Sequence, residues 1–361
     1  MHLCYIADAS NVHPQRWAAF FVERGHRVSV ITDLAGTVPG ASVYNIGECL
    51  PRLSLPVFSA VYQIIAKTLA IRRLIGHIRP DIVHGHYATN YGFLAALSGF
   101  TPLVQTVHGS DVLVDAAGSW EQRWFVRYAL RKATLITSVA EHMIRKVRSM
   151  GISPECILTF QYGVDTSVFA PPADTTVRNP LRVVSTRMFE WKYNVEQLIR
   201  AVPGVQARIP DAEVVLAGDG PDRAALARLI QGLHIERMVT MAGRVAPDVI
   251  PALLQSATVY VSTSVTDGSS LSLIEAMACG AFPVVTDIPA NQEWIVDGEN
   301  GFLVPVGDAD ALADRIVWAF EHPAAREAMV ARNLDLIRRR GDYRTNMTMM
   351  EGVYERLLRE R

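Results

Sequence analysis

The stretch VSTSVTDGSSLSLIEAMACGAFPVV, residues 261–285, decides the fold class of this chain. The run Val259–Val261 that leads into it is typical of a buried strand, and Phe282–Val285 favours a second strand. Between them a polar loop precedes Leu271–Ala278, whose apolar residues recur at helical spacing, and Gly280 stands where a helix usually ends. We therefore expect a strand, a loop, a short helix and another strand, in that order.

The loop of this unit has the features of a phosphate seat. Backbone N–H groups at a helix N-terminus favour an anion, and Gly268–Leu271 would supply them here. Two carboxylates flank the seat, Asp267 in the loop and Glu275 in the helix. Carboxylates accept hydrogen bonds from sugar hydroxyls, so a ligand with both phosphate and sugar explains the arrangement. The alternative is that Asp267 only solubilises the loop and Glu275 is an ordinary helix residue.

The same stretch resembles the donor-binding signature of the retaining glycosyltransferases of family 4, also called glycosyl transferases group 1. In that signature two Glu residues are separated by seven others, and the second opens an EAMAxGxPVV run. Asp267 takes the first place here, and Glu275 takes the second. The resemblance implies the α/β GT-B fold, with two Rossmann-like doubly wound parallel-sheet domains facing a central cleft. Asp at position 267 is one methylene shorter than the usual Glu and bears on the choice of donor sugar.

Length and composition agree with two domains and exclude some partners. The chain has 361 residues, of which 50% are hydrophobic, which is more than one compact domain usually holds. Lys and Arg total 35 against 36 Asp and Glu, so bulk charge predicts no nucleic-acid partner. The first 165 residues are mildly basic, which would suit an anionic or membrane-linked acceptor.

Cysteine usage and hydropathy suggest the compartment. The four cysteines have no metal-like spacing, so we expect reduced thiols; they are Cys4, Cys49, Cys156 and Cys279. The N-terminus runs straight into a strand without a signal-peptide pattern, and no stretch is apolar for the ~18 residues of a spanning helix. We expect a cytoplasmic protein that can associate peripherally with the inner membrane face.

Strands and helices alternate along the whole chain, as in doubly wound α/β domains. The resemblance implies three parts: residues 1–168 as the acceptor-binding domain, 169–340 as the nucleotide-sugar-binding domain, and 341–361 as a helix crossing back. The Pro-containing stretch near Asp165–Arg178 is the expected linker. Beyond the opening unit, the expected strands are Leu3–Ala7, Arg27–Ile31, Asp81–His84, Leu103–Val107, Leu135–Ser138, Ile157–Phe160, Leu181–Ser185, Val214–Ala217 and Met238–Met241.

Polar residues follow several strands of the first half, where ligands of α/β sheets bind. The turn after the first strand lacks a GxGxxG dinucleotide fingerprint and resembles the acceptor-side loop of family 4, which implies an acceptor-side role for Ser10, Asn11 and His13. His13 could contact the acceptor or the donor phosphates, and the alternative is a solvated polar residue of the loop. His108 and Asp111 belong to a family-like His-Gly-Ser-Asp motif, which implies that His108 lies near the donor sugar and Asp111 on the acceptor side. For His84 and His86 we favour core histidines, and no third ligand at zinc spacing accompanies them.

The second half carries an Arg and a Lys just past a strand end. Arg187 offers a bidentate fork and Lys192 a point charge, and the two can converge on one anion. In the resembled family such a pair binds the donor diphosphate. Other expected donor-binding residues are Gly218 and Gly220 in a GxGP turn, Gly243, Arg244 and Val245 as base contacts, Gly268, Ser269, Ser270 and Leu271 in the phosphate seat, and Glu275.

Two further patterns have ordinary explanations. The segment Leu50–Arg79 is helical and basic, which suits either an anionic membrane surface or, as we favour, a core-facing helix with its charges in water. The Asp308–Asp310 pair spells a DxD motif, but it opens a helix at Ala311–Glu321, so N-capping explains it without a metal.

The resemblance thus implies retaining, metal-independent transfer of a hexose or N-acetylhexosamine from a nucleotide-sugar, most readily a UDP-sugar, to a hydroxyl acceptor. That acceptor is expected to be a glycan, a lipid-linked or anionic intermediate, or a small molecule. No cofactor or metal is expected. His108, Arg187, Lys192 and Asp267 are the expected catalytic residues. The alternatives are a nucleotide-sugar epimerase of the same fold, for which no acid/base set around a sugar carbon is evident, and a non-catalytic nucleotide-sugar-binding protein.

Overall fold

The computed structural model describes residues 1–47 and 56–360, and Cys49 lies outside them. The chain divides into two compact units. Unit 1 comprises Met1–Gln161 together with Met347–Arg361, and unit 2 comprises Tyr162–Asn346. The limits expected from the sequence for the second domain were residues 169 and 340.

Unit 1 is built on a seven-stranded parallel sheet with the strand order β3-β2-β1-β4-β5-β6-β7. The chain order reverses between β1 and β4, so a crevice is expected at the carboxyl ends of these two strands. The strands are β1 (His2–Ile6), β2 (Arg27–Thr32), β3 (Ser42–Asn45), β4 (Ile82–His86), β5 (Leu103–Val107), β6 (Leu135–Ser138) and β7 (Ile157–Thr159). The helices are α1 (Val12–Glu23), α2 (Pro56–Ile78), α3 (Tyr91–Ser98), α4 (Ala116–Gly118), α5 (Trp120–Lys132) and α6 (Glu141–Ser149).

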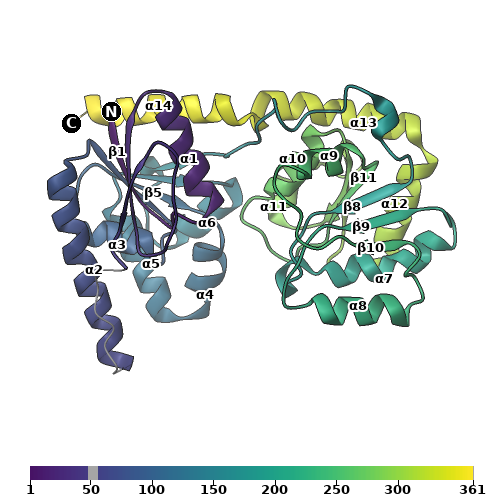
Figure 1. Cartoon of the computed structure of the whole chain (residues 1–361), viewed down its shortest axis with the longest axis horizontal. Helices are drawn as coiled ribbons and strands as arrows, with labels where there is room; N and C mark the ends of the chain where they lie inside the picture. The colour runs from purple at the N-terminus through teal and green to yellow at the C-terminus, as the bar shows by residue number, and fades with distance from the viewer. Residues whose placement is uncertain (48–55, 361) are drawn as a thin grey trace. The chain divides into compact units, whose positions relative to one another are not determined.

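Unit 2 has a six-stranded parallel sheet with the order β10-β9-β8-β11-β12-β13 (Figure 1), and its order reverses between β8 and β11. The strands are β8 (Arg182–Ser185), β9 (Glu213–Leu216), β10 (Val239–Met241), β11 (Val259–Ser262), β12 (Phe282–Thr286) and β13 (Phe302–Val304). The helices are α7 (Val195–Gln206), α8 (Arg223–Gly232), α9 (Ile250–Gln255), α10 (Leu271–Ala278), α11 (Pro289–Gln292), α12 (Ala309–Glu321) and α13 (Pro323–Leu336). The last helix, α14 (Tyr343–Arg359), belongs to unit 1 from Met347 onward.

The opening stretch folds as its pattern predicts. In β11, Val259 and Val261 belong to one buried cluster and Tyr260 to another, because successive strand side chains point to opposite faces of the sheet. After α10, Gly280 adopts a φ of 77°, the left-handed conformation that glycine tolerates best. Its N–H donates to the carbonyl of Met277 at 3.1 Å and closes the helix end.

The end of the chain packs in unit 1. Tyr354 of α14 is fully buried, and its hydroxyl lies 2.5 Å from Nδ1 of His84 and accepts a 3.2 Å hydrogen bond from Nε1 of Trp17. Glu351, one turn earlier, accepts hydrogen bonds from Arg24 at 2.9 Å and His26 at 2.6 Å. Residues from Met347 onward therefore belong physically with the first sheet.

Among residues 1–47 and 56–360, the helices are all too short or too polar to cross a membrane. The β3 strand was not expected from the sequence. Its side chains are only partly buried or exposed, so the segment lacks the apolar run that marks the central strands.

Candidate active site

Arg187 organises the carboxyl end of the sheet in unit 2. It follows β8 and is 92% buried, with 8% of its surface exposed. Its Nη1 donates to the Ser272 hydroxyl at 2.8 Å, and its Nη2 donates to the Ser264 hydroxyl at 2.9 Å and to the Asp267 carboxylate. Burial works to lower the pKa of Arg187, but its interactions with Asp267, Tyr260 and Tyr193 together outweigh burial and raise the pKa above its ordinary value. The guanidinium thus ties β8 to the loop after β11 and to the first turn of α10.

Two buried polar atoms in this region have no hydrogen-bond partner among the residues that the structure describes. They are Nε of Arg187 and the hydroxyl of Ser270, which precedes α10 without capping it. Buried polar groups in proteins are normally satisfied, so such orphaned donors point to a ligand or ordered water. An anion at this helix N-terminus would satisfy both.

Lys192 joins Arg187 through one aromatic ring. The Arg187 guanidinium carbon lies 4.2 Å from the centre of the Tyr193 ring, and Lys192 Nζ lies 5.0 Å from the same centre. Lys192 also pairs with Glu190 at 2.9 Å. The structure therefore brings the two expected phosphate-binding cations to the same loop, with Tyr193 beside both.

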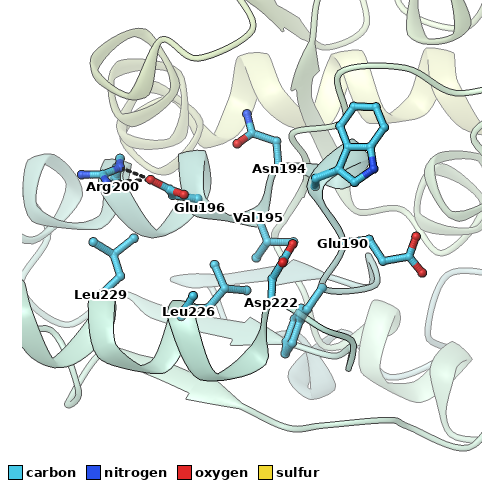
Figure 2. A pocket seen from close by; sticks show the side chains of 11 residues that line it. Glu190, Asn194, Val195, Glu196, Arg200, Asp222, Leu226 and Leu229 are labelled. Atoms are coloured by element: carbon cyan, nitrogen blue, oxygen red, sulfur yellow. Dashed lines mark hydrogen bonds and ion pairs between the residues drawn. The ribbon is translucent and has the colours of Figure 1, made fainter.

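A pocket of about 550 Å³ borders this loop on the side of α7 and α8 (Figure 2). It includes three carboxylates, from Glu190, Glu196 and Asp222. Its one cationic lining residue, Arg200, is engaged by Glu196 at 2.6 Å. This charge balance makes the pocket a poor seat for a diphosphate, so the phosphate site is better placed at Arg187.

The predicted glycines hold the Arg187 loop in place. A Cβ on Gly218 would lie 2.2 Å from the carbonyl oxygen of Arg187, and one on Gly220 would lie 2.4 Å from that of Phe189. The N–H of Phe189 donates to the backbone carbonyl of Asp219 at 3.1 Å and joins the same two segments. Only glycine lets the turn after β9 come this close to the chain that carries Arg187.

The remaining donor-side predictions lie at the same sheet edge. Gly243 follows β10 with a φ of 73°, and Arg244 beside it is exposed while Val245 is partly buried. Gly268 is buried, and the carbonyl of Ser269 accepts from the N–H of Leu271 at 2.9 Å. Glu275 lies within α10, and its charge adds to burial in raising the pKa of Cys279 to about 12.

Unit 1 has its own pocket, of about 360 Å³, at the carboxyl ends of β1, β2, β4 and β5. Two of the predicted residues, Asn11 and His108, line it. The His13 ring lies 6.0 Å from the His108 ring, centre to centre. Ser10 sits in the exposed turn before α1 and donates its N–H and its hydroxyl to Asp8. The structure thus gathers the first-half predictions at the switch point between β1 and β4.

Asp111 is not among the residues that line this pocket, and its side chain supports the surrounding backbone instead. It is fully buried, and its carboxylate accepts backbone N–H bonds from Ala88 at 2.9 Å, His108 at 3.2 Å, Gly109 at 2.9 Å and Val112 at 3.0 Å. Burial raises its pKa, and these bonds offset part of that rise. Asp111 therefore fixes the loop that follows His86 at the end of β4 and the loop after β5 that carries His108.

His108 is held by a second histidine. Its Nε2 lies 3.2 Å from Nδ1 of His86, and burial lowers the pKa of His108 to about 3. His86, itself 2% exposed, has a pKa lowered well below the ordinary value by burial and by the neighbouring histidines. Both rings are consequently neutral at physiological pH.

Comparison with known proteins matches both halves of the chain. The family model of glycosyl transferases group 1 covers residues 173–334, and the model of glycosyl transferase 4-like proteins covers residues 2–140. A phosphatidyl-myo-inositol mannosyltransferase from Mycolicibacterium smegmatis is 31% identical over 353 residues, which are 95% of this chain and 89% of that protein. The chain belongs to glycosyltransferase family 4.

One further relative and two solved structures are similar to this family 4 chain over nearly its whole length. The N-acetyl-α-D-glucosaminyl L-malate synthase of Bacillus anthracis is 22% identical over 358 residues, covering 94% of this chain and 91% of that one. The structure of a sucrose-phosphate synthase from Thermosynechococcus elongatus superposes with a TM-score of 0.84 at 18% identity over 100% of both chains. The structure of Anabaena HepE in complex with UDP and glucose superposes with a TM-score of 0.80 at 19% identity, over 98% of this chain and 99% of that one. The predicted GT-B fold is confirmed.

The protein is thus a retaining, nucleotide-sugar-dependent glycosyltransferase of family 4. Several lining residues of the unit 1 pocket were not predicted as site residues: Asp8, Asp33, His86, Tyr87, Asn90 and Tyr91. Asp8 and Asp33 come directly after the first two strands, and this position was the signal that could have found them.

The basic segment of the family 4 enzyme faces the core of unit 1 with Ile71 and Ile75 of α2, as the core-facing interpretation expects. Not all of its charges are left in water, because two of its cations are engaged within unit 1. Residues 50–55 of that segment lie outside the described residues. In α2, Lys67 donates to Asp33 at 2.6 Å, and Arg72 donates to the carbonyl of Leu97 at 2.8 Å.

The DxD motif is explained as predicted. Asp308 caps α12 by accepting the N–H of Ala311 at 2.8 Å. In the described parts of the chain, no group of three His, Cys, Asp or Glu side chains is placed to hold a metal ion.

Proposed function

We propose that this enzyme transfers a hexose or N-acetylhexosamine from a UDP-sugar to a hydroxyl acceptor, with retention at the anomeric carbon and without a metal ion. Arg187, Lys192 and the amides of Gly268–Leu271 bind the diphosphate. Glu275 holds the ribose hydroxyls, Asp267 the hexose hydroxyls, and His108 the sugar near its reacting carbon. Gly243, Arg244 and Val245 contact the base.

The observation that carries the proposal is the state of Arg187. A guanidinium that is 92% buried keeps one donor, Nε, without a partner among the described residues, beside a helix start where the Ser270 hydroxyl is equally unsatisfied. Burying an unsatisfied donor costs about 1–3 kcal/mol, so a site of this kind is stabilised when a ligand supplies acceptor oxygens. A diphosphate has such oxygens and the matching charge.

The chemistry requires stabilisation of a leaving anion. As the bond between the anomeric carbon and the diphosphate oxygen breaks, negative charge grows on the diphosphate, and Arg187 and Lys192 offset it electrostatically. The acceptor oxygen forms its bond to the anomeric carbon from the same face and passes its proton to the departing diphosphate. No protein nucleophile is needed in this scheme.

Similar proteins support the choice of donor and acceptor class. The HepE structure contains UDP and glucose, and the structure of a pneumococcal O-GlcNAc transferase contains UDP and N-acetylglucosamine. The Bacillus anthracis relative is named as an N-acetyl-α-D-glucosaminyl L-malate synthase. Other relatives are named for mannosyl transfer to phosphatidylinositol-type acceptors. A glycan, lipid-linked or small-molecule hydroxyl is therefore the proposed acceptor, and a lipid-linked one would bring the protein to the inner face of the membrane.

The test is calorimetric binding and slow hydrolysis with UDP-, GDP- and ADP-linked sugars, with EDTA and without acceptor. We expect one UDP-sugar to bind and hydrolyse in EDTA, with the released sugar initially in the donor's anomeric form. Tighter binding of GDP-mannose would overturn the choice of base. A lack of binding by all donors would overturn the assignment of Arg187.

A further inference from the structure

The pocket of unit 1 has the size of a monosaccharide site. Its volume of about 360 Å³ lies at the lower end of the range for small-molecule pockets, roughly 300–1,000 Å³. Pro14 and Leu34 supply apolar surface on one part of the wall, which suits the C–H face of a ring. The other lining residues are polar: Asp8, Asn11, Asp33, His86, Tyr87, Asn90, Tyr91 and His108.

The charge of this wall is negative or neutral. Asp8 and Asp33 are its two charged residues, and among the described residues that line it there is neither Lys nor Arg. Lys67 approaches Asp33 from α2 at 2.6 Å, so that carboxylate is neutralised, while Asp8 is not paired with a cation among the described residues. Asp115 adds a further carboxylate just behind Tyr87, at 3.2 Å from its hydroxyl.

Three polar groups on the wall are available to a ligand. Both bonds from Ser10 end on Oδ1 of Asp8, which leaves Oδ2 without a hydrogen bond to the described residues. The amide of Asn90 is exposed and does not cap α3, and Nε2 of His86 is buried without a partner in the described structure. These are an anionic acceptor, an amide that donates and accepts, and a neutral imidazole nitrogen, a set that matches hydroxyl groups.

We propose that this pocket binds an uncharged polyhydroxylated ring, a sugar or a cyclitol, as the acceptor, and that it discriminates against carboxylate or phosphate groups placed inside it. The inference rests on the proposed function and names the acceptor class of that reaction. Hydroxyls of the ring donate to Asp8 and His86 and exchange hydrogen bonds with Asn90. An anionic group finds no cation on the wall and meets the field of Asp8 instead. The first half of the chain is mildly basic in composition, but the described residues that line the pocket include no Lys or Arg.

The charge of Asp8 sets the size of the discrimination. A second negative charge at about 5 Å, with an effective dielectric constant of about 20, is disfavoured by roughly 250-fold before salt screening, and we expect about tenfold at physiological salt. A phosphate that links the ring to a lipid can lie outside the pocket without this penalty.

The experiment compares acceptor probes with the same ring, one of which carries an anionic group at a single position. Methyl α-D-glucopyranoside is paired with methyl α-D-glucuronide, and myo-inositol with myo-inositol 1-phosphate; L-malate is added as an open-chain dianion. Binding is measured by ligand-observed NMR on the full chain without donor, and transfer is measured as kcat/KM with the donor that hydrolyses. We expect at least one uncharged ring to bind and accept, with about a tenfold advantage over its charged partner.

Substitutions test whether the wall itself makes the distinction. Asp8→Asn should reduce the neutral-to-anionic ratio about tenfold. Asn11→Asp keeps the carbonyl-type oxygen that caps α1 at 2.9 Å from the N–H of His13, adds a charge, and should widen the ratio. Glu155→Gln removes an exposed carboxylate elsewhere in unit 1 and should leave the ratio and the donor hydrolysis unchanged. If Asp8→Asn fails to fold, Asn11→Asp still decides the matter.

The outcomes separate this inference from the proposed function. Donor hydrolysis together with a preference for malate or a sugar phosphate, or with no uncharged ring bound at all, would overturn the inference and leave the transferase function intact. Absence of donor binding with an uncharged ring still bound in the NMR experiment would overturn the proposed function alone. An unchanged ratio in both variants would show that the pocket wall does not select the acceptor.

Discussion

Arg187, which is buried, and Asp267, which is partly buried, form an ion pair that connects the loops following β8 and β11. Ser264 and Ser272 hold the same guanidinium, so its orientation is set from three points. Asp267 stands where family 4 enzymes usually have Glu, and in this chain its carboxylate is committed to the cation expected to bind phosphate. In the donor site that we propose, the pair couples the sugar side to the phosphate side.

Removing the charge of Asp267 should separate its effect on UDP binding from its effect on sugar transfer. Asp267→Asn takes a negative charge away from the phosphate seat, so we expect UDP to bind about three- to tenfold more tightly while transfer falls by roughly 100-fold. Asp267→Glu should retain most of the activity. Calorimetry with UDP and steady-state rates measure the two quantities. Glu213→Gln, which removes a carboxylate from the surface pair with Arg182, serves as control and should change neither. Weaker UDP binding in Asp267→Asn would contradict the coupling.

Gly218 should be intolerant of even one added methyl group. In Gly218→Ala the Cβ would lie 2.2 Å from the carbonyl of Arg187, so the backbone that carries the guanidinium has to shift. A displacement of about 1 Å at a reacting site can cost about 100-fold in rate. We expect weaker donor binding and a comparable loss of kcat/KM. Gly232→Ala at the end of α8, where nothing lies within 4 Å, is the matched control and should be neutral or slightly stabilising. Equal effects of the two substitutions would argue against a specific contact with Arg187.

The position of the proposed donor-side residues at one sheet edge could be predicted from the sequence, because these residues are close together in the chain and follow strands with clear apolar runs. Asp267 and Glu275 lie on one loop and one helix, and Arg187 and Lys192 lie on one turn. Parallel pairing of β8 with β11 then brings the two segments together. What could not be predicted is that Asp267 would turn to Arg187, because side-chain pairing across a sheet edge has no local pattern.

The acceptor side was harder to predict because its residues come from four separate connections. Asp8, Asp33, Tyr87 and His108 meet only once β1, β2, β4 and β5 have taken their places. Asp111 was expected to face the acceptor, yet it is buried and binds backbone N–H groups, since a short carboxylate two residues after a glycine can satisfy its own loop. A motif identifies such a residue without revealing which way its side chain points.

Tyr354 should contribute strongly to the stability of unit 1. In Tyr354→Phe, the buried Nε1 of Trp17 and Nδ1 of His84 both lose a partner. An unsatisfied buried polar group costs about 1–3 kcal/mol, so we expect the free energy of unfolding to fall by about 2–4 kcal/mol. Urea unfolding measures it. Tyr128→Phe removes a hydroxyl that makes no hydrogen bond with the described residues and should change stability by less than about 0.5 kcal/mol. A similar small effect in Tyr354→Phe would show that Trp17 and His84 find other partners.

Mild acid should destabilise unit 1 through its buried histidines. Burial lowers the pKa of His84, His86 and His108, the last to about 3, whereas an unfolded histidine has a pKa of about 6.5. Below pH 6.5 the unfolded chain therefore binds protons that the folded chain does not, so the stability present above that pH is lost as the pH falls. Between pH 7 and pH 5.5 each such histidine should cost about 1 kcal/mol of unfolding free energy. Urea titrations at the two pH values measure this loss of unfolding free energy, and His86→Gln should reduce the loss by about 1 kcal/mol.

The control for this prediction is His77→Gln, at an exposed site near the end of α2, which should leave the loss unchanged. A stability that does not vary between these pH values would mean that the three rings take up protons in the fold, contrary to their burial.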